Sequence, residues 1–348
     1  MTASPTLPLS EWQRIAQHLL QAAGLSESHA ACMADSMMWA QSRDIDGHGL
    51  SRLPFYLNFI ERGIINRNPQ LHWTLELPSM MRLDADRAAG AVALAHVRDR
   101  LIEHARTHGL CAIWINHTTH TGAHGWFTQA LAKQGFCAIS MAASVPNMAY
   151  QGSRIPALST APLSMAIPHG EGQAMVLDMA TSAVSLGRLN RARLRQETLP
   201  ADWALDSQGE PTTEAAQAVL LQAMAGAKGS GLALMIEMLC SVVSGAPILS
   251  SMLGQEPAQR RHRQNAWVCA INAQALLSPE ALTSDVAATV AAIKALPRRA
   301  GVPELLLPGE RGERCHARAL AHGLSLSPET WQDVQSSAEK FGISLNPS

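Results

Sequence analysis

The chain has 348 residues, of which 47% are hydrophobic and 16% are charged, and its formal net charge is -1. This composition is that of a globular protein with a sizeable core, and the length allows two or three domains. A near-neutral charge and only 4% aromatic residues argue against a nucleic-acid-binding surface, which needs basic patches or stacking aromatic rings.

The chain carries no evident targeting or membrane segment. Its first eight residues lack the basic and apolar pattern of a secretory signal, and the most apolar region, residues 218–254, is interrupted by charges, glycine and proline. The six cysteines are scattered without C-x-x-C spacing. We therefore expect reduced thiols and a cytoplasmic protein.

Three helices are predicted in the first part of the chain. The first is expected at residues 10–23 with Ser10 as its cap, the second after Ser26, and the third from Leu53-Pro54, where proline suits a first turn. The segment 43–52 is then a loop held between two helices, which is a common setting for catalytic groups.

This loop, Arg43-Asp44-Ile45-Asp46-Gly47-His48-Gly49-Leu50-Ser51-Arg52, is unusually rich in chemistry. The imidazole of His48 can give or take a proton near neutral pH, and the fork of donors on Arg52 matches a carboxylate. The flanking glycines allow a ligand to approach closely. The alternative is that His48 is one of many ordinary histidines, since the chain has 14.

After Pro69 the pattern becomes that of an α/β domain with a mixed sheet, and from Ser284 it returns to helices that end in one capped by Ser327. We expect the two helical ends to pack together. The predicted parts are 1–75, 76–283 and 284–348. Short apolar runs predict strands at Cys111–Ile115, Phe136–Met141, Leu163–Ile167, Met175–Leu177 and Trp267–Ile271, and helices are expected at Ala91–His108 and Thr128–Gln134.

A second polar cluster, residues 116–125, follows the first of these predicted strands. His120 and His124 are four residues apart, which on a helix would suit a metal, but Gly122 and Gly125 disfavour a regular helix and no carboxylate is near in sequence. We expect no metal. Backbone amides of this turn could hold a ligand, or the segment could simply be a polar turn.

Two further stretches could belong to a site. Residues 176–182 form a strand that ends in a turn carrying Asp178, and residues 225–231 form a glycine-rich turn with Lys228 before a helix. The latter could receive an anion or could be only a packed helix start. It matches neither a Walker A loop nor G-x-G-x-x-G, so a Rossmann cofactor site is unsupported.

In their order along the chain, these stretches resemble the malate/L-lactate dehydrogenase family that lacks a Rossmann fold, with ureidoglycolate, sulfolactate, diketogulonate and piperideine- or pyrroline-2-carboxylate oxidoreductases among its members. The resemblance covers nearly the whole chain, and its specificity comes from the order of the motifs. The matching stretches are Asp44–Pro54, Asn116–Gly125, Pro162–Pro168, Val176–Ser182, Gly209–Thr213, Lys228–Leu234 and Leu307–Arg311.

The resemblance implies a homodimeric oxidoreductase that transfers a hydride between NAD or NADP and a small 2-oxo or 2-hydroxy acid. The implied fold is a non-Rossmann, nicotinamide-binding mixed-sheet domain with a helical domain built from both chain ends. His48 would exchange the proton, Arg52 would bind the substrate carboxylate, and Thr160 would lie near the substrate. The residues implied to contact the cofactor are His120, Thr121, Gly122, Ala123, His124, Asp178, Met179, Ala180, Lys228, Pro308, Gly309 and Glu310.

Three positions depart from the family pattern. Gly47 stands where serine is common, Ala161 where asparagine is usual, and Gly226-Ala227 precede Lys228 in place of two glycines or a polar residue. These departures leave the proton donor and the carboxylate clamp intact but remove a hydroxyl that could relay a proton.

Alternatives remain within this resemblance. The substrate could be a cyclic imino acid such as pyrroline- or piperideine-2-carboxylate, or the chain could be a paralogue that binds the nucleotide without turnover. Arg188, Arg191 and Arg193 could pair with the 2′-phosphate of NADP or form a solvated basic turn.

Overall fold

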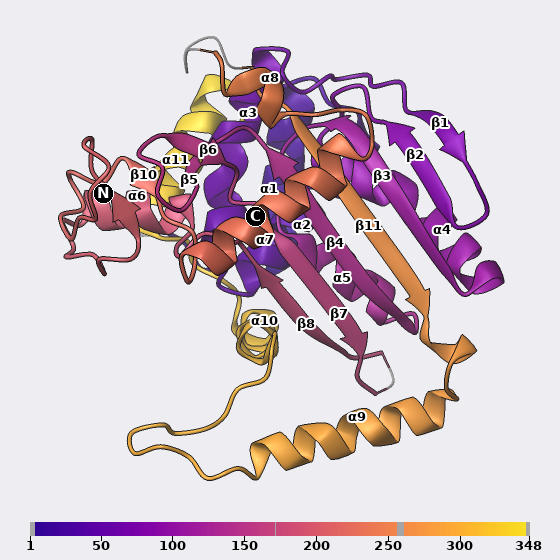
Figure 1. Ribbon diagram of the computed structural model, residues 1–348. Coiled ribbons are helices and arrows are strands. Elements are labelled where there is room, and N and C mark those ends of the chain that lie inside the picture. Colours follow the sequence, from indigo (N-terminus) through magenta and orange to yellow (C-terminus); the bar gives the residue numbers. More distant parts are fainter. Residues whose placement is uncertain (1–3, 171, 256–260, 346–348) are drawn as a thin grey trace.

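A mixed sheet runs through the middle of the molecule in this computed structural model, which describes residues 4–170, 172–255 and 261–345 (Figure 1). Strands β2 and β3 are parallel, and the other five neighbouring pairs are antiparallel. The predicted mixed sheet is thus confirmed. In spatial order the strands are β1 (His72–Glu76), β2 (Met80–Asp84), β3 (Leu110–Thr118), β11 (Gln264–Asn272), β4 (Phe136–Ser144), β7 (Leu163–Pro168) and β8 (Ala174–Met179).

Helices cover both faces of this sheet, which explains why its central strands are apolar without strict alternation. One face packs against α4 (Gly90–His108) and α5 (His124–Ala132), and the other against α7 (Ala227–Glu237) and the π-helical turn η3 (Met238–Val242). The side chains of β11 alternate between the two cores, with Val268 in the larger and Trp267 against the smaller.

The smaller core lies under a second sheet of four short strands. Its order is β6 (Pro156–Leu158), β5 (Met148–Ala149), β10 (Leu220–Leu221) and β9 (Ala204–Leu205), and α6 (Leu186–Leu194) packs beside it. The chain pattern did not predict these short strands, because a strand of two residues has no measurable alternation.

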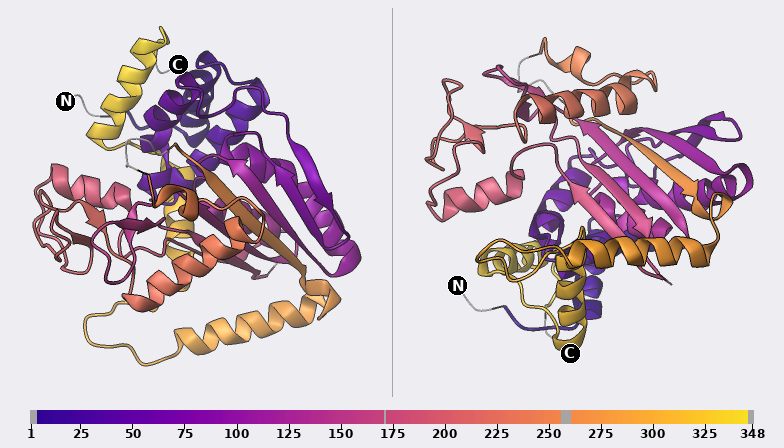
Figure 2. Two further views of the ribbon diagram at one scale, coloured as in Figure 1. Left: turned by 45° about the horizontal axis from the view of Figure 1, so that its top comes forward. Right: turned by 60° about the horizontal axis from the view of Figure 1, so that its bottom comes forward.

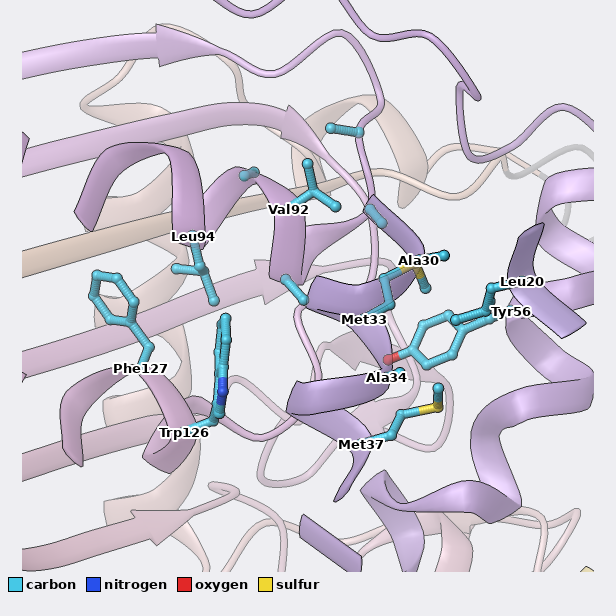
Figure 3. Close-up of a cluster of buried hydrophobic side chains, with 14 of the residues drawn as sticks. Leu20, Ala30, Met33, Ala34, Met37, Tyr56, Val92, Leu94, Trp126 and Phe127 are labelled. Atoms are coloured by element: carbon cyan, nitrogen blue, oxygen red, sulfur yellow. The ribbon is translucent and has the colours of Figure 1, made fainter. Parts of the chain in front are cut away.

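The larger core joins the helical ends to the sheet. Met33 and Met37 of α2 (Glu27–Ser42) meet Tyr56 of α3 (Leu53–Glu61) and the side chains of α4 and α5 (Figure 3). From the other end of the chain, Trp331 of α11 (Pro328–Lys340) packs edge-on against Trp12 of α1 (Leu9–Ala22), with ring centroids 5.7 Å apart. Helix α10 (Glu310–His322) contacts α2.

Helix α9 (Pro279–Lys294) behaves differently from the other C-terminal helices. It follows the turn η5 (Ala273–Ala275), lies beyond the ends of the strands and has no buried residue (Figures 1 and 2). The expectation that the whole C-terminal part packs with the N-terminal helices therefore fails for α9, which also begins five residues before the predicted Ser284.

Two other helix starts differ from the predictions. Pro8, not Ser10, occupies the N-cap position of α1, and no side chain caps that end. Helix α5 begins at His124 instead of Thr128, so Gly125 is helical. A side chain there would come within 2.4 Å of Trp39, which explains why glycine occupies a helical position. Ser26 and Ser327 cap α2 and α11 as predicted.

The remaining features are the lengths of the apolar helices and the state of the cysteines. No helix in the described ranges is both long and apolar enough to cross a bilayer. All six cysteines are free, as the scattered spacing predicted. The short helix α8 (Leu249–Met252) precedes β11.

Candidate functional site

The loop between α2 and α3 forms two single 3₁₀ turns, η1 (Asp46–His48) and η2 (Leu50–Arg52). Its conformation is fixed from both sides. Gln41 of α2 accepts a hydrogen bond from the Leu50 amide at 2.9 Å, and Arg191 of α6 pairs with Asp46 at 3.1 Å. The loop therefore sits between the helical part and the small-sheet region, and its side chains are held by packed elements.

His48 has no side-chain hydrogen bond to the described residues, and its ring stacks on that of His120 at 5.7 Å between centroids. Burial, and then the positive charge of Arg52, lower the pKa of His48 to about 4. The imidazole is therefore neutral at physiological pH and free to exchange a proton with a ligand.

Arg52 is the positive charge beside these imidazoles. Its Nε donates to the carbonyl of Gly47 at 2.6 Å, and its guanidinium lies 5.5 Å from the ring of Phe55. Among the described residues no carboxylate pairs with it. Burial lowers the pKa of Arg52, which means that desolvation destabilises its charged form. An anionic ligand would offset this loss of free energy.

His120 is oriented by two contacts to its Nδ1. The Gly122 amide donates to Nδ1 at 3.3 Å, and the hydroxyl of the buried Tyr56 lies 2.8 Å away. Since Nδ1 accepts from an amide, the proton of the neutral ring resides on Nε2. Burial and the charge of Arg52 lower the pKa of His120 well below its usual value. Its Nε2–H is a donor for a ligand.

His124, in contrast, is fully buried and uses both ring nitrogens within the protein. Nδ1 lies 2.5 Å from the hydroxyl of Ser140 and Nε2 lies 2.8 Å from that of Thr121, which also accepts from Gln264. Its ring therefore has no free nitrogen for a cofactor. In the described segments no three His, Cys, Asp or Glu side chains are grouped as a metal site requires.

Asp178 lies at the end of β8, opposite the first turn of α5. Its Oδ2 accepts from the Gly125 amide at 2.8 Å, while desolvation raises the pKa of its carboxyl to about 7. No partner of Oδ1 is found in the described part of the chain. Met179 and Ala180 follow and are partly exposed, and the carbonyl of Thr160 accepts from the Thr181 amide at 2.9 Å. Asp178–Ala180 and Thr160 are therefore neighbours.

The other predicted cofactor residues lie on two sides of this region. The turn before Lys228 is tied to the same segment, because the Met224 amide donates to the Thr181 carbonyl at 2.9 Å; Lys228 itself is exposed. The turn 308–310 lies along β8, with the Pro308 carbonyl 3.4 Å from the Val176 amide.

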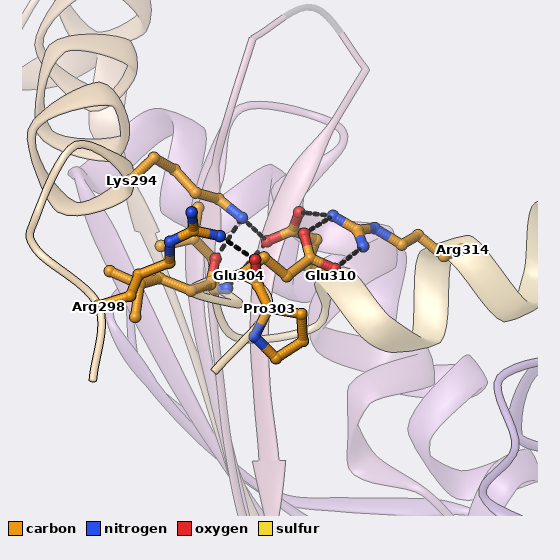
Figure 4. Close-up of polar contacts among 8 residues, drawn as sticks. Lys294, Arg298, Pro303, Glu304, Glu310 and Arg314 are labelled. Carbon is orange, nitrogen blue, oxygen red and sulfur yellow. Dashed lines mark hydrogen bonds and ion pairs between the residues drawn. The ribbon is translucent and has the colours of Figure 1, made fainter. Parts of the chain in front are cut away.

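Glu310 is engaged within the protein. Its carboxylate binds Lys294, Arg314 and the Leu307 amide, which lower its pKa to about 2 (Figure 4). Its side chain therefore anchors the chain between α9 and α10, so a contact of this residue with a cofactor would come from its backbone.

The three arginines of α6 are also engaged in the protein. Arg188 pairs with Glu197 at 2.6 Å, Arg191 with Asp46, and Arg193 donates to the Ala218 carbonyl. They fasten α6 to its surroundings, so the choice between NAD and NADP does not follow from them.

The residues present suit a nicotinamide nucleotide in their donors and acceptors. A carboxyl oxygen without a partner at Asp178 can accept from an amide or ribose hydroxyl, and the Nε2–H of His120 and the ammonium of Lys228 can donate. Arg52 and His48 stand beside this set with an unpaired charge and an unpaired imidazole. The arrangement can bind a carboxylate next to a group that exchanges a proton.

Sequence reasoning missed Tyr56, Phe55 and His262. Tyr56 and Phe55 were detectable, since they follow Arg52 at helical spacing on α3. His262 reaches the same region from the segment before β11, as shown by its ring contact with Phe59 at 5.1 Å. No local pattern marks it.

Comparisons with known proteins find relatives over nearly the whole chain. The family model described as malate/L-lactate dehydrogenase matches residues 7–335. Ureidoglycolate dehydrogenase (NAD(+)) of Escherichia coli is 32% identical over 329 residues, covering 93% of each chain. (2R)-3-sulfolactate dehydrogenase (NADP(+)) of Chromohalobacter salexigens is 33% identical over 245 residues, 70% of this chain and 73% of the relative. The structure of sulfolactate dehydrogenase from Methanocaldococcus jannaschii superposes with a TM-score of 0.87 at 26% identity, covering 97% and 98% of the chains.

Proposed function

The chain belongs to the malate/L-lactate dehydrogenase family, and we propose that it reduces a small 2-oxo acid with His48 as proton donor and Arg52 as carboxylate-binding residue. As a member of this family it is an oxidoreductase that uses NAD or NADP. The bound nicotinamide supplies or takes up the hydride, and the residues of this chain bind, orient and exchange the proton.

Arg52 is the observation that carries the proposal. A half-buried guanidinium without a carboxylate partner among the described residues costs free energy, and a substrate carboxylate would form two parallel hydrogen bonds with its free nitrogens. A carboxylate bound there would place the adjacent 2-oxo carbon near the imidazoles of His48 and His120. This supports a 2-oxo acid over a neutral ketone.

Substrate binding would also prepare His48 for its role. The charge of Arg52 is one of the two causes of the low pKa of His48. Burial is the larger cause and remains when substrate binds, but a bound carboxylate neutralises the charge of Arg52, so the pKa of His48 should rise toward its usual value. In the oxidation direction, the neutral ring already present can accept the hydroxyl proton.

For the cofactor we propose contacts with His120, Thr121, Gly122, Ala123, Asp178, Met179, Ala180 and Lys228, and with the backbone of Pro308, Gly309 and Glu310. The support is that the segments before Lys228 and around Pro308 adjoin Thr181 and β8 through backbone hydrogen bonds. The turn 120–123 is followed by Gly125, whose amide donates to the Asp178 side chain. For His124 we propose an indirect role, since its ring holds Thr121 and Ser140 in place.

The test is the loss of reduced-nicotinamide absorbance with NADH and NADPH separately, against pyruvate, oxaloacetate, other 2-oxo acids and the two cyclic imino acids. A rate with an open-chain acid supports the proposal. A rate with cyclic imines alone would instead assign the reductase function, because Arg52 and His48 serve a C=N bond as well as a C=O bond. Cofactor binding without any turnover would indicate the non-catalytic paralogue.

We also propose that the protein is a cytoplasmic homodimer in which α9 contributes to the interface. Helix α9 has no buried residue, and apolar side chains at its two ends, Leu276, Ile293 and Leu296, are exposed. A second copy covering this helix would remove that apolar surface from water. Light scattering coupled to size exclusion tests this: a monomer at micromolar concentration would contradict it, and Ile293→Glu should weaken the dimer.

A further inference from the structure

His262 carries an unsatisfied hydrogen-bonding group in the candidate site. It lies just before β11, and its Nε2 is buried without a hydrogen-bond partner in the described part of the chain. Its ring packs edge-on against that of Phe59, with centroids 5.1 Å apart. A buried nitrogen that could hydrogen-bond but does not costs free energy, so a ligand that pairs with it is the simplest reason for its presence.

The neighbours of His262 connect it to the carboxylate-binding arginine. Phe59 contacts Phe55 at 4.0 Å, and the guanidinium of Arg52 lies 5.5 Å from the ring of Phe55. Arg52, Phe55 and Phe59 stand at helical spacing along one face at the start of α3. His262 therefore lies at the far end of an apolar wall that begins at Arg52.

Two imidazoles flank the same wall. The ring of His120 contacts Phe55 at 5.6 Å and stacks on His48, and its pKa is lowered by the charge of Arg52 and by His262 when His262 is protonated. His262 is thus within electrostatic range of the groups that would bind and protonate the reacting carbon. Since burial lowers its pKa to about 4, it presents a neutral imidazole.

We propose that His262 binds a second, oxygen-bearing polar group of the substrate, such as a carboxylate, at the end opposite the one held by Arg52. This inference rests on the proposed function, because it takes the position of the first carboxylate from Arg52. With an oxygen acceptor, the proton of the ring settles on Nε2 and donates to the ligand. His262 then distinguishes dicarboxylic acids from acids that end in a methyl group.

His124 provides the internal contrast for this assignment. It is also a buried neutral histidine near the site, but Ser140 and Thr121 satisfy both its nitrogens. A histidine kept only for packing would be expected to look like His124. In the described part of the chain His262 lacks such a partner on Nε2, and it contacts Phe59, which follows Phe55 and Arg52 along α3.

The kinetic test uses two substrates of the same chain length, oxaloacetate and 2-oxobutyrate. His262→Phe keeps an aromatic ring against Phe59 but removes the donor, and His262→Gln restores an amide N–H near the position of Nε2. For His262→Phe we expect kcat/KM to fall about 10- to 100-fold for oxaloacetate and to change little for 2-oxobutyrate, with partial recovery in His262→Gln. Equal losses for both substrates, or no loss for either, would overturn the proposal.

A binding measurement separates this inference from the proposed function. Succinate and butyrate lack a reacting 2-oxo group, and their affinities for the protein with NADH can be compared by calorimetry. Succinate should bind about tenfold more tightly than butyrate, and this ratio should approach one in His262→Phe. If no acid is turned over but the ratio behaves in this way, the proposed function fails and the inference stands. If the wild type turns over a 2-oxo acid but binds succinate and butyrate equally, the inference about His262 is refuted and the proposed function stands.

Discussion

The His48 pocket and the connection between α9 and α10 both gather ionisable side chains, but they differ in how these are partnered. In the connection, Glu310 binds Lys294 and Arg314, and Arg314 also binds Glu304, mostly at the surface (Figure 4). In the pocket, Arg52 and His262 are half-buried; among the described residues Arg52 has no carboxylate partner and the buried Nε2 of His262 has no hydrogen-bond partner.

The paired charges of the connection have a structural role, whereas the unpaired groups of the pocket are suited to bind a ligand. Exposed pairs gain little from each other, because water screens them and already solvates each charge. A buried polar group without a hydrogen-bond partner lowers the stability of the fold. Such groups are found at functional sites, where a bound ligand supplies the missing partner. The contrast predicts that changes in the pocket affect activity strongly, whereas changes in the connection affect stability weakly.

The largest effect is expected for His48→Asn. Asparagine keeps a polar group of similar size but cannot exchange a proton, so kcat should fall by about 10²–10⁴-fold. The affinity for the reduced cofactor, measured by nucleotide fluorescence, should stay near that of the wild type. An equal loss of cofactor affinity would instead make His48 a structural residue.

Arg52→Lys should have the next largest effect. A point charge replaces a planar fork, so KM for the 2-oxo acid should rise about 10- to 100-fold while kcat changes less. Steady-state kinetics at saturating cofactor measure this. Lys294→Arg, which alters a cation of the α9–α10 connection, is the matched control and should leave KM unchanged. An unchanged KM in Arg52→Lys would remove the proposed carboxylate contact.

Lowering the pH should reduce the free energy of unfolding in two different pH ranges, one set by the buried histidines and one by Glu310 of the α9–α10 connection. The pKa of His124 is lowered from 6.5 to about 3 by burial and by His48 when His48 is protonated. His124 is therefore protonated below about pH 6.5 in the unfolded chain but stays neutral in the folded chain. The free energy of unfolding falls as the pH drops below 6.5. Between pH 6.5 and 5 this amounts to at most about 2 kcal/mol for His124.

The carboxyl of Glu310 acts with the same sign but in a lower pH range. Its pKa is lowered from 4.5 to about 2, so its contribution is present above pH 4.5 and is lost only below it. Urea unfolding at pH 7, 6 and 5 should therefore report the loss that arises from the buried histidines. The raised pKa of Asp178 acts in the opposite direction over the same range, so the measurement is made in Asp178→Asn. A free energy of unfolding that stays constant from pH 7 to pH 5 in that variant would show that the histidines are not held neutral.

Glu310→Gln should have a smaller effect. The amide oxygen can still accept from the Leu307 amide, but the pairing with Lys294 and Arg314 is lost. We expect the free energy of unfolding to fall by less than about 1 kcal/mol. Trypsin cleavage after the exposed Arg298 and Arg299 should become faster. A loss of several kcal/mol would mean that this connection is a core element.

The parts that could be predicted from the sequence are those set by local spacing. The loop with His48 and Arg52, the caps at Ser26 and Ser327, and five strands of the large sheet follow from neighbouring residues. Edge strand β1 could not be predicted, because most of its residues are exposed and it has no apolar face.

The parts that could not be predicted depend on contacts between distant segments. His120 and His124 look equivalent in sequence, yet one ring stacks on His48 while the other is enclosed by Ser140 and Thr121. The two rings differ because α5 begins at His124, so that His124 is helical and His120 lies in the turn before the helix. His262 is more than two hundred residues from His48. Its place in the pocket depends on the order of β11 in the sheet, which no local pattern reveals.

The two glycines beside His48 allow the smallest effect to be measured against a matched control. A side chain at Gly47 would meet one atom, the Ser185 hydroxyl oxygen at 3.9 Å, and the backbone there is not left-handed. Gly47→Ser, which introduces a hydroxyl next to His48, should therefore change the free energy of unfolding by less than about 0.5 kcal/mol.

Gly49 is the control because the Gln41 side chain leaves no room for a side chain at this position. A Cβ there would come within 2.3 Å of the Gln41 side-chain oxygen, the atom that accepts from the Leu50 amide and fixes the loop. Gly49→Ser should cost about 1–3 kcal/mol in urea unfolding, because either the new side chain or Gln41 must move. If Gly47→Ser were the more destabilising change, the loop would be anchored by α6 and not by α2. The pocket would then depend on the small-sheet region for its shape.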